Sequence, residues 1–554
     1  MPPKRLYMKY AIALLFFLFS ASEVFCQHGT LRFSNDFKVT ESQYKHETVT
    51  NSIYFNNDFY TVTNSAISGA KWLFTKLYDV KFSVTVSHFD QDMNTVKEVV
   101  LENGEKNFGP LIPKLISFNN KLYLAYFKAA DKASFGVYLA ALDEKTIALG
   151  EPKLICTIKQ DNVGIGQIES VITAGLVYFV ISPDNARLLA VCKSAPNKVQ
   201  ATLLDDKLQT IKQSLVSVNL ESFEIPSAVL TDDNRACLVL DAKEGTRLLC
   251  LGPNGEKTEI RYNGVGNFAP YFTRAKLAND GKTILIYSTT VESGQTDSWC
   301  TGIMIAQLDA TTFKMSKPLT YAMTPEFVRS VSEKGGGIKH KGDYFMSNFT
   351  PQLLQLENGD IAIIGSPERT VSTTSTSAPN MNNQTHMIAV TTLTVGPVIV
   401  LFPDKNGKTY DQVIVPREIV LSKGQSSGSG AIQVVTAPRQ SDVTTGFLAT
   451  RLGQDIVIIY NDNVKNLSKD VDEKTTVSKS AGDLELAEAL VSGNRKLEYR
   501  KLISETKKGR ATFYLGSSVP AANTSTLVFP IGKEGQGFNA LKTYYTNWCF
   551  LDIK

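Results

Sequence analysis

The chain has 554 residues, of which 43% are hydrophobic, 20% charged and 10% aromatic. These fractions exclude a disordered chain, and 37 Gly with 21 Pro exclude a collagen-like one. The net charge of +4, from 58 basic and 54 acidic residues, is too balanced to suggest capture of nucleic acid by bulk electrostatics. A length prior of about 150 residues per domain predicts three or four domains.

Residues 1–26 have the features of a secretory signal peptide. Basic residues precede a nine-residue apolar run, Ala11–Phe19. This run is too short to cross about 30 Å of hydrocarbon as a helix, which takes roughly 20 residues. Val24 and Cys26 are small enough for the −3 and −1 positions of a cleavage site. We therefore expect a mature chain that begins at Gln27 and is secreted, periplasmic or part of the cell envelope.

Two other interpretations of this segment stay open. It could be a buried N-terminal helix, or Cys26 could carry a lipid, although Glu23 and Phe25 fit poorly just before a lipidated cysteine. No later stretch is long and apolar enough to span a membrane, so no transmembrane span is expected in the mature chain.

Six cysteines follow the signal segment, too few for a disulfide scaffold in a chain of this length. Cys237 and Cys250 flank the predicted turn 242–245 and would lie opposite one another on a hairpin. They could form a cross-strand disulfide or stay two buried free thiols that pack as small apolar residues. No other pair of cysteines is expected to meet.

Nearly every apolar segment after the signal is short and alternates with a period of two. These segments are rich in Val, Ile, Tyr, Phe and Thr, which predicts strands separated by turns. The one helical candidate is Asp483–Val491. Its residues Leu484, Ala487 and Val491 have helical spacing, which predicts a short, isolated surface helix.

One hairpin pattern occurs seven times: apolar residues, a tight polar turn, then an alternating strand. Its turn residue is of a type that tolerates φ > 0, as tight hairpins require. The seven turn residues are Asn57, Asn120, Gly175, Asn234, Gly281, Gly359 and Gly453. A proline suited to the entrance of a strand precedes four of the turns: Pro113, Pro226, Pro270 and Pro351.

A second hairpin follows the first in most copies, most clearly at residues 137–146 and 303–312, so each unit holds about four strands. Four-stranded units repeated at about 50–60 residues predict an all-β fold, a β-propeller. Packing such sheets face to face around an axis buries both faces of each sheet and leaves only short edges. A string of β-sandwich domains is the alternative, but sandwiches need units nearer to about 100 residues.

The two ends of the chain are expected to close the ring. Strand patterns occur at residues 30–40, before the first repeat, and at residues 519–554, after the last. We expect these two ends to complete one blade together. Residues 27–554 would then form a single β-propeller domain of about seven four-stranded blades, with six or eight as alternatives, in place of three or four domains.

Two units are longer than the others because they contain polar inserts, near 371–385 and 422–430. Both are rich in small residues and have no packing pattern, which predicts surface loops. The glycine-rich segment 333–342 predicts a third loop. A functional lid is the alternative for such loops, since long loops often carry function.

The sequence contains few signs of catalysis. None of its five histidines pair at i, i+4, and it has no C-x-x-C pair, phosphate-binding loop or G-x-S-x-G elbow. His88 lies on an alternating strand and is interpreted as structural. The catalytic residues are therefore unknown, and no cofactor-binding or metal-binding residue is predicted.

Two acidic clusters could offer oxygen ligands to Ca²⁺. One contains Asp404, Asn406 and Asp411, but it lacks the acidic spacing of an EF-hand, and a hairpin turn explains it better. The other lies at residues 470–473 and is better interpreted as a solvated charged loop.

Residues 25–27, where the signal ends in FCQ, and repeats such as FNNKLYLAY (118–126) and IVIIYNDNVKN (456–466) carry a resemblance. They resemble uncharacterised secreted, propeller-like proteins of Bacteroidetes. The resemblance implies a Gram-negative envelope or extracellular setting, and it brings no catalytic residues.

We expect the chain to act as a non-enzymatic binding or scaffold module whose ligand is a glycan or a protein and not a nucleic acid. Binding would use one loop face or the mouth of the central channel. The alternative is a carbohydrate-active enzyme, a glycoside hydrolase or lyase, on the same scaffold. Carboxylates or arginines that converge at the channel mouth would favour the enzyme, whereas an apolar and neutral lining would exclude it.

Overall fold

The structure, a computed structural model, describes most of the chain between residues 29 and 553. The described ranges are 29–33, 39–42, 48–66, 82–90, 94–101, 113–129, 134–159, 177–293, 299–340, 343–347, 349–376, 387–427, 446–469, 473, 475–479, 484–504, 512–513, 519–520, 526–534 and 542–553. The predicted signal segment, the turn residue Gly175 and residues 470–472 lie outside them. No helix in these ranges is both long enough and apolar enough to cross a lipid bilayer.

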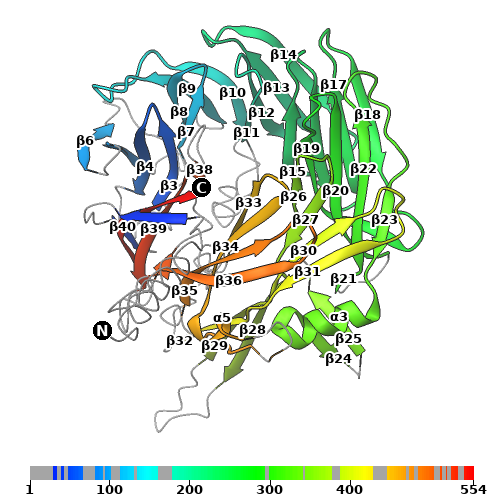
Figure 1. The fold of residues 1–554 in the computed structure, drawn as a ribbon. Coiled ribbons are helices and arrows are strands. Elements are labelled where there is room, and N and C mark those ends of the chain that lie inside the picture. Colours follow the sequence, from blue (N-terminus) through cyan, green and yellow to red (C-terminus); the bar gives the residue numbers. More distant parts are fainter. Residues whose placement is uncertain are drawn as a thin grey trace, which may run out of the picture.

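Seven four-stranded antiparallel sheets, sheets 1–7, follow one another along the chain (Figure 1). Sheet 1 contains β3 (Thr48–Phe55), β4 (Asp58–Ala66), β5 (Phe82–Phe89) and β6 (Thr95–Leu101), and sheet 2 contains β7 (Lys114–Phe118), β8 (Lys121–Ala129), β9 (Ser134–Leu142) and β10 (Lys153–Lys159). Sheet 3 contains β11 (Val177–Ile181), β12 (Leu188–Ala195), β13 (Lys198–Leu204) and β14 (Thr210–Ser217). Sheet 4 contains β15 (Glu224–Leu230), β16 (Ala236–Ala242), β17 (Gly245–Leu251) and β18 (Lys257–Tyr262).

Sheets 5 to 7 have the same order of strands but contain insertions. Sheet 5 consists of β19 (Phe268–Leu277), β20 (Thr283–Glu292), β22 (Gly302–Asp309) and β23 (Leu319–Ala322). Sheet 6 consists of β26 (Gln352–Gln355), β27 (Ile361–Gly365), β30 (Val398–Pro403) and β31 (Tyr410–Val415). Sheet 7 consists of β33 (Phe447–Leu452), β34 (Asp455–Asn463), β35 (Leu484–Val491) and β36 (Leu497–Ser504).

A further sheet, the terminal sheet, joins the two ends of the chain. The long strand β40 (Lys542–Ile553) pairs with β1 (Gly29–Phe33), β2 (Val39–Ser42) and β39 (Thr526–Glu534). The short strands β37 (Thr512–Phe513) and β38 (Val519–Pro520) pair with β39. This sheet contacts sheet 1 through β2 and β38, and sheet 7 through β1 and β37.

The chain is therefore an all-β protein of the β-propeller class. The predicted pairing of the N-terminal and C-terminal strands is confirmed. Each of the seven predicted hairpin segments falls in its own four-stranded sheet. With the terminal sheet, and without the two three-stranded sheets described below, the described chain has eight repeated sheets, at the upper end of the predicted range.

The predicted turn chemistry explains the first hairpin of each sheet. Six of the seven predicted turn residues are described, and all six have positive φ: Asn57 (67°), Asn120 (54°), Asn234 (67°), Gly281 (66°), Gly359 (82°) and Gly453 (62°). In sheet 3, the residue with positive φ between β11 and β12 is Asn185 (57°) and not the predicted Gly175, which precedes β11. Asn and Gly occupy this left-handed region at low cost, so the chain reverses there.

The hydrophobic core lies between neighbouring sheets, because the middle strands of each sheet bury both of their faces. In β16, Leu238 packs towards sheet 3, and Val239 packs towards sheet 5. The first strands of consecutive sheets contact each other, as β11 does with β15 and β15 with β19, so they form the inner side of the assembly (Figure 1). We call the first strands of sheets 1–7 the inner strands.

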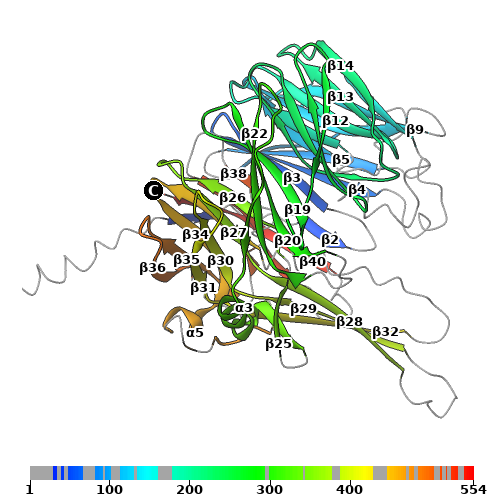
Figure 2. The ribbon, with the colours of Figure 1, turned by 90° about the vertical axis from the view of Figure 1, so that its right-hand side faces the viewer.

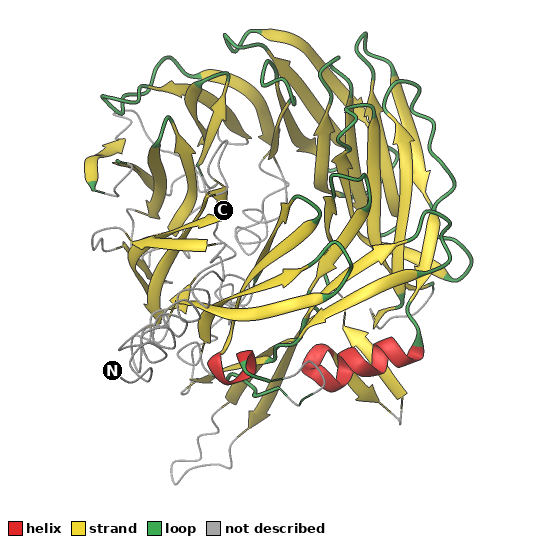
Figure 3. Ribbon diagram, in the orientation of Figure 1, coloured by secondary structure: helices red, strands yellow, loops and turns green. Residues whose placement is uncertain are grey.

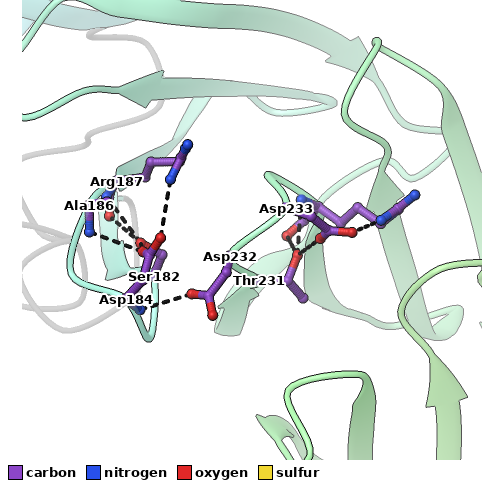
Figure 4. A network of polar contacts seen from close by, with 8 residues as sticks. Ser182, Asp184, Ala186, Arg187, Thr231, Asp232 and Asp233 are labelled. Atoms are coloured by element: carbon purple, nitrogen blue, oxygen red, sulfur yellow. Dashed lines mark hydrogen bonds and ion pairs between the residues drawn. The ribbon is translucent and has the colours of Figure 1, made fainter.

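The two rims of the propeller differ. Short turns connect the first strand to the second and the third to the fourth, and they form one rim, the turn rim. In Figure 4, Asp232 from the turn of sheet 4 accepts a hydrogen bond from the backbone N of Asp184 in the turn of sheet 3, at 2.9 Å. Within its own turn, Asp184 accepts a bond from the backbone N of Ala186 at 3.0 Å. The turn rim is thus held by side-chain hydrogen bonds between sheets.

The opposite rim, the insert rim, carries the inserted elements that the structure describes. Two three-stranded sheets are found there, one of β21 (Trp299–Cys300), β24 (Gly337–His340) and β25 (Asp343–Ser347), the other of β28 (Glu368–Thr376), β29 (Met387–Val395) and β32 (Ile419–Ser427). The helices α3 (Pro325–Val331) and α5 (Val464–Leu467) lie on this side as well (Figures 2 and 3), and a π-helical turn, η5 (Ser332–Gly336), follows α3.

Several predicted loops contain regular structure. Residues 371–376 belong to β28 and residues 422–427 to β32, where each pairs with β29. The glycine-rich segment forms η5 and β24 over residues 333–340. The loop prediction was wrong for these parts because Ser and Thr suit a solvent-exposed strand in 371–376 and 422–427, and because residues 337–340 pair with the adjacent strand β25.

The predicted helix at 483–491 is wrong, since Leu484–Val491 forms β35. Leu484, Ala487 and Val491 are all buried. As the third strand of sheet 7, β35 buries both faces, and a strand buried on both faces shows no clean alternation.

The prediction that only Cys237 and Cys250 would meet was wrong. Cys156 of β10 and Cys192 of β12 form a disulfide that joins sheets 2 and 3. Cys237 and Cys250 are directly opposite one another on β16 and β17, as expected, but they are free thiols with 3.8 Å between their sulfur atoms. The alternative of two buried free thiols is therefore the one observed.

Candidate functional site

The candidate site is a polar group at the insert-rim end of sheets 4 and 5, which we call the Asp241 cluster: Glu224, Asp241, Thr246, Thr273 and Arg274. Glu224 begins β15, and its cross-strand partner on β16 is Asp241. The Thr246 hydroxyl on β17 donates to Asp241 Oδ1 at 2.7 Å and lies 3.2 Å from the Thr273 hydroxyl on β19. Three neighbouring strands of sheet 4 and the inner strand of sheet 5 therefore meet here.

An irregularity in β19 shapes this site. The register of β19 against β20 shifts between Tyr271 and Arg274, and Phe272 has a φ of 50°. A bulky residue rarely adopts that conformation, so the backbone is strained at this point. The extra residue turns Thr273 into the protein, where it is fully buried, and leaves Tyr271 36% exposed. Bulges of this kind are often found beside functional sites, where they redirect a side chain.

The bulge contains an aromatic pair that directly precedes Thr273 and Arg274 of the cluster along β19. The rings of Tyr271 and Phe272 are 4.3 Å apart in an edge-to-face arrangement. The Thr289 hydroxyl donates to the carbonyl oxygen of Tyr271 at 2.9 Å, which holds the bulge in place. Tyr271 therefore presents an anchored, solvent-accessible ring on an inner strand.

Two carboxyl groups and two cations share the site. Burial raises the pKa of Asp241, and the nearby Glu224 charge adds to this, whereas the bond from Thr246 and the Arg274 charge oppose it. Burial lowers the pKa of Lys193 on β12, and Glu224 opposes that shift. The Lys193 Nζ donates to the carbonyl oxygen of Phe223, just before Glu224. An interior with both signs of charge and a carboxyl of raised pKa is typical of functional sites.

An open groove of about 670 Å³ lies on the insert rim of sheets 3 and 4. It is lined by Pro196, Asn197, Val218, Asn219, Leu220, Glu221 and Glu244. Three short segments form it: the β12–β13 turn, the β16–β17 turn that follows Asp241, and the connection that leads into Glu224. A ligand in the groove would contact Glu221 and Glu244, each of which lies three residues along the chain from a carboxyl group of the cluster.

A second polar group, the Arg417 cluster, is fully buried beneath the insert rim. The Arg417 guanidinium donates to Ser366 Oγ at 3.0 Å and to the carbonyl oxygens of Gly396 and Gly446 at 3.1 and 3.2 Å. Burial lowers the pKa of Arg417 to about 10, so it stays protonated at neutral pH. Nearby, burial raises the pKa of Asp462 to about 7. Because neither side chain reaches solvent, we interpret this cluster as the anchor of the β28–β29–β32 sheet.

The residues singled out in the sequence have structural roles where they are described. His88 Nε2 lies 2.7 Å from Asp58 Oδ2, and its ring stacks on Tyr60, which confirms the structural interpretation. Asp404 accepts bonds from the backbone N of Asn406 and Lys408 within its hairpin turn, as predicted. Across the described ranges, no three His, Cys, Asp or Glu side chains lie close enough together to hold a metal ion.

Sequence reasoning did not find the Asp241 cluster. The only local signals were Pro270, which was placed correctly at a strand, and the turn 242–245, which follows Asp241. Neither signal indicates that Asp241 of sheet 4 meets Thr273 and Arg274 of sheet 5. That contact depends on the packing of two sheets and on a bulge that has no motif.

The comparisons with known proteins assign no family. No protein-family model matches the chain, and no curated protein matches it. Similar solved structures include the β-propeller domain of the trilobed protease from Pyrococcus furiosus, at 10% identity and a TM-score of 0.33, covering 84% of this chain and 97% of that one. The WD40 domain of SCAP from fission yeast has 8% identity and a TM-score of 0.35, with coverage of 93% and 98%. A protein of unknown function from Bacteroides caccae has 10% identity and a TM-score of 0.25, with coverage of 60% and 89%.

Proposed function

We propose that the chain is an exported β-propeller that binds a glycan at the Asp241 cluster and does not transform it. The observation that carries this proposal is the bulge of β19, which holds the ring of Tyr271 exposed beside hydrogen-bonding side chains of both charges. An aromatic ring can pack against the apolar face of a sugar, while carboxylate, guanidinium and hydroxyl groups bond its hydroxyls. Binding pockets commonly combine these two elements.

Export is proposed from two features. The sequence begins with a pattern typical of a signal peptide, and the disulfide between Cys156 and Cys192 is of the kind that persists in oxidising compartments. Both features support a secreted, periplasmic or cell-envelope location.

A carbohydrate-active enzyme is the second candidate, and one observation favours it. Glu224 and Asp241 are cross-strand partners, and burial raises the pKa of Asp241, as is usual for a general acid. Against catalysis, Asp241 Oδ1 is already bonded to Thr246 within the protein. We therefore assign these carboxyl groups to ligand binding.

A glycan array with a parallel hydrolysis assay tests the proposal. We expect the purified protein to bind a subset of glycans and to release no sugar from them. Tyr271→Ala should abolish binding, whereas Leu215→Ala, which truncates a 63% exposed apolar side chain on the outer strand β14, should leave it unchanged. If the unmodified protein releases sugar and the Asp241→Asn variant does not, the chain is a carbohydrate-active enzyme and the proposal is wrong. Binding that survives Tyr271→Ala would refute the assigned site.

A further inference from the structure

Two cations approach the inner strand of sheet 6 from opposite sides, near the turn rim. Lys276 of β19 donates from Nζ to the carbonyl oxygen of Leu353 at 3.0 Å. Arg451 of β33 donates from Nη1 to the carbonyl oxygen of Gln355 at 3.2 Å. Both acceptors belong to β26, so the side chains of sheets 5 and 7 meet over the strand between them. Both side chains are exposed, although their strands are inner strands.

Within the part of the chain that the structure describes, no carboxylate neutralises this pair. Among the described residues, no Asp or Glu side chain forms an ion pair with Lys276 or Arg451. Asp280 is in the turn that follows Lys276, but its carboxylate accepts bonds from the backbone N of Lys282 and Thr283, both at 2.8 Å, and from the Thr283 hydroxyl at 2.7 Å. Its oxygens are therefore committed to that turn.

The two cations also repel each other. Desolvation of the ammonium by neighbouring protein atoms lowers the pKa of Lys276, although its side chain still contacts solvent, and the positive charge of Arg451 lowers it further. Like charges held together without a counter-charge cost free energy, which an anion between them would recover. Each side chain retains unused N–H donors for such an anion, because an ammonium has three and a guanidinium five.

The inner strands as a whole are basic. Their charged residues are Lys114, Glu224, Arg274, Lys276 and Arg451, four basic and one acidic. The complete chain is nearly balanced, at 58 basic to 54 acidic residues. The excess of positive charge on the inner side therefore comes from the placement of these residues and not from composition.

We propose that Lys276 and Arg451 bind an anionic group, a carboxylate, sulfate or phosphate, that approaches from the turn rim. The group is either a free anion or a substituent of a larger ligand. Charge-assisted hydrogen bonds from the two side chains hold it, in the mode in which Arg and Lys recognise such groups elsewhere. The site shares β19 with the Asp241 cluster, since Arg274 lies two residues before Lys276, but it uses neither Tyr271 nor the carboxyl groups of the cluster. The K276Q/R451Q and Tyr271→Ala variants therefore test the two proposals separately.

Calorimetric titration with three probes tests this site: inorganic sulfate, inorganic phosphate and glucuronate, each at constant ionic strength. We expect saturable binding of at least one probe, and the doubly substituted K276Q/R451Q protein should bind it at least about tenfold more weakly. A factor of ten corresponds to about 1.4 kcal/mol, which is within the range that the loss of charge-assisted bonds typically costs. The probe that binds most tightly identifies the chemistry of the group.

The matched control is K243Q/R261Q, which removes the same charge from exposed positions in the β16–β17 turn and on the outer strand β18. It should bind the probe as the unmodified protein does. Melting curves of all the proteins show which variants fold. If the double variant does not fold, the binding test uses the single variants K276Q and R451Q. The proposal is overturned if no probe saturates the unmodified protein, or if the inner and control variants weaken binding equally.

Discussion

Replacement of Asp462 by asparagine tests the account of the buried polar residues beneath the insert rim. Asp462 is 1% exposed, and its Oδ1 accepts bonds from Asn466 Nδ2 at 2.8 Å and from the backbone N of Asn463 at 2.7 Å. Its other oxygen, Oδ2, is buried without a hydrogen-bond partner in the described structure. Asparagine keeps an oxygen for both bonds and has nearly the same shape, but it cannot carry a charge.

The expected effect depends on pH. Burial raises the pKa of Asp462 from 3.8 to about 7, so the folded protein holds this proton more tightly than the unfolded chain does. The stability that comes from this difference is present in full below about pH 4 and is lost as the pH rises to about 7. At about 1.36 kcal/mol per unit, the complete loss is on the order of 4 kcal/mol, of which about 3 kcal/mol falls between pH 5 and pH 8.

Urea unfolding at pH 5, 6, 7 and 8, followed by fluorescence, measures the effect. The stability of Asp462→Asn relative to the unmodified protein should increase by about 3 kcal/mol across this series, with the increase ending near pH 7. Asp404→Asn serves as a control whose stability relative to the unmodified protein should not change between pH 5 and pH 8. Hydrogen bonds from its own turn lower the pKa of Asp404, so its contribution is lost towards acid pH. A stability difference for Asp462→Asn that does not change with pH would refute the reasoning.

Two further predictions concern covalent and steric constraints. The Cys156→Ser/Cys192→Ser variant should lose roughly 4 kcal/mol of stability, because the disulfide closes a loop with a sequence separation of 36. Calorimetry with and without reductant checks this prediction. It would be contradicted if reductant did not change the melting temperature of the unmodified protein. Gly302→Ala should cost about 1–3 kcal/mol in urea unfolding, since its added Cβ would lie 2.4 Å from the carbonyl oxygen of Tyr321. Gly150→Ala, whose nearest contact is 3.5 Å, should be nearly neutral, and equal costs for the two would contradict the steric argument.

Much of the architecture was predictable because it is local. Period-two alternation marked the strands, and Asn or Gly at positions such as Asn57, Asn234 and Gly281 marked the reversals, where positive φ is observed. Repetition of this unit predicted a propeller, since isolated four-stranded sheets leave both faces uncovered. The strand patterns at the two ends predicted the terminal sheet for the same reason.

The failures occur where a neighbour distant in sequence decides the local structure. β35 has helical spacing of apolar residues but forms a strand because sheets on both sides bury it. The polar segment 422–427 pairs with β29, at least 30 residues earlier in the chain, instead of forming a loop. The pairing of Cys156 with Cys192 requires sheets 2 and 3 to stack, which cysteine spacing does not reveal.

The sequence by itself determined the class of this protein: an all-β chain of repeated hairpins whose ends pair. Only the tertiary structure decided which side chains meet. Thr246 reaches Thr273, Lys276 reaches Leu353, and Arg451 reaches Gln355, across gaps of 27, 77 and 96 residues. Turns and alternation arise from backbone conformations of a few residues, whereas both proposed sites arise from the packing of one sheet against the next, which no local pattern encodes.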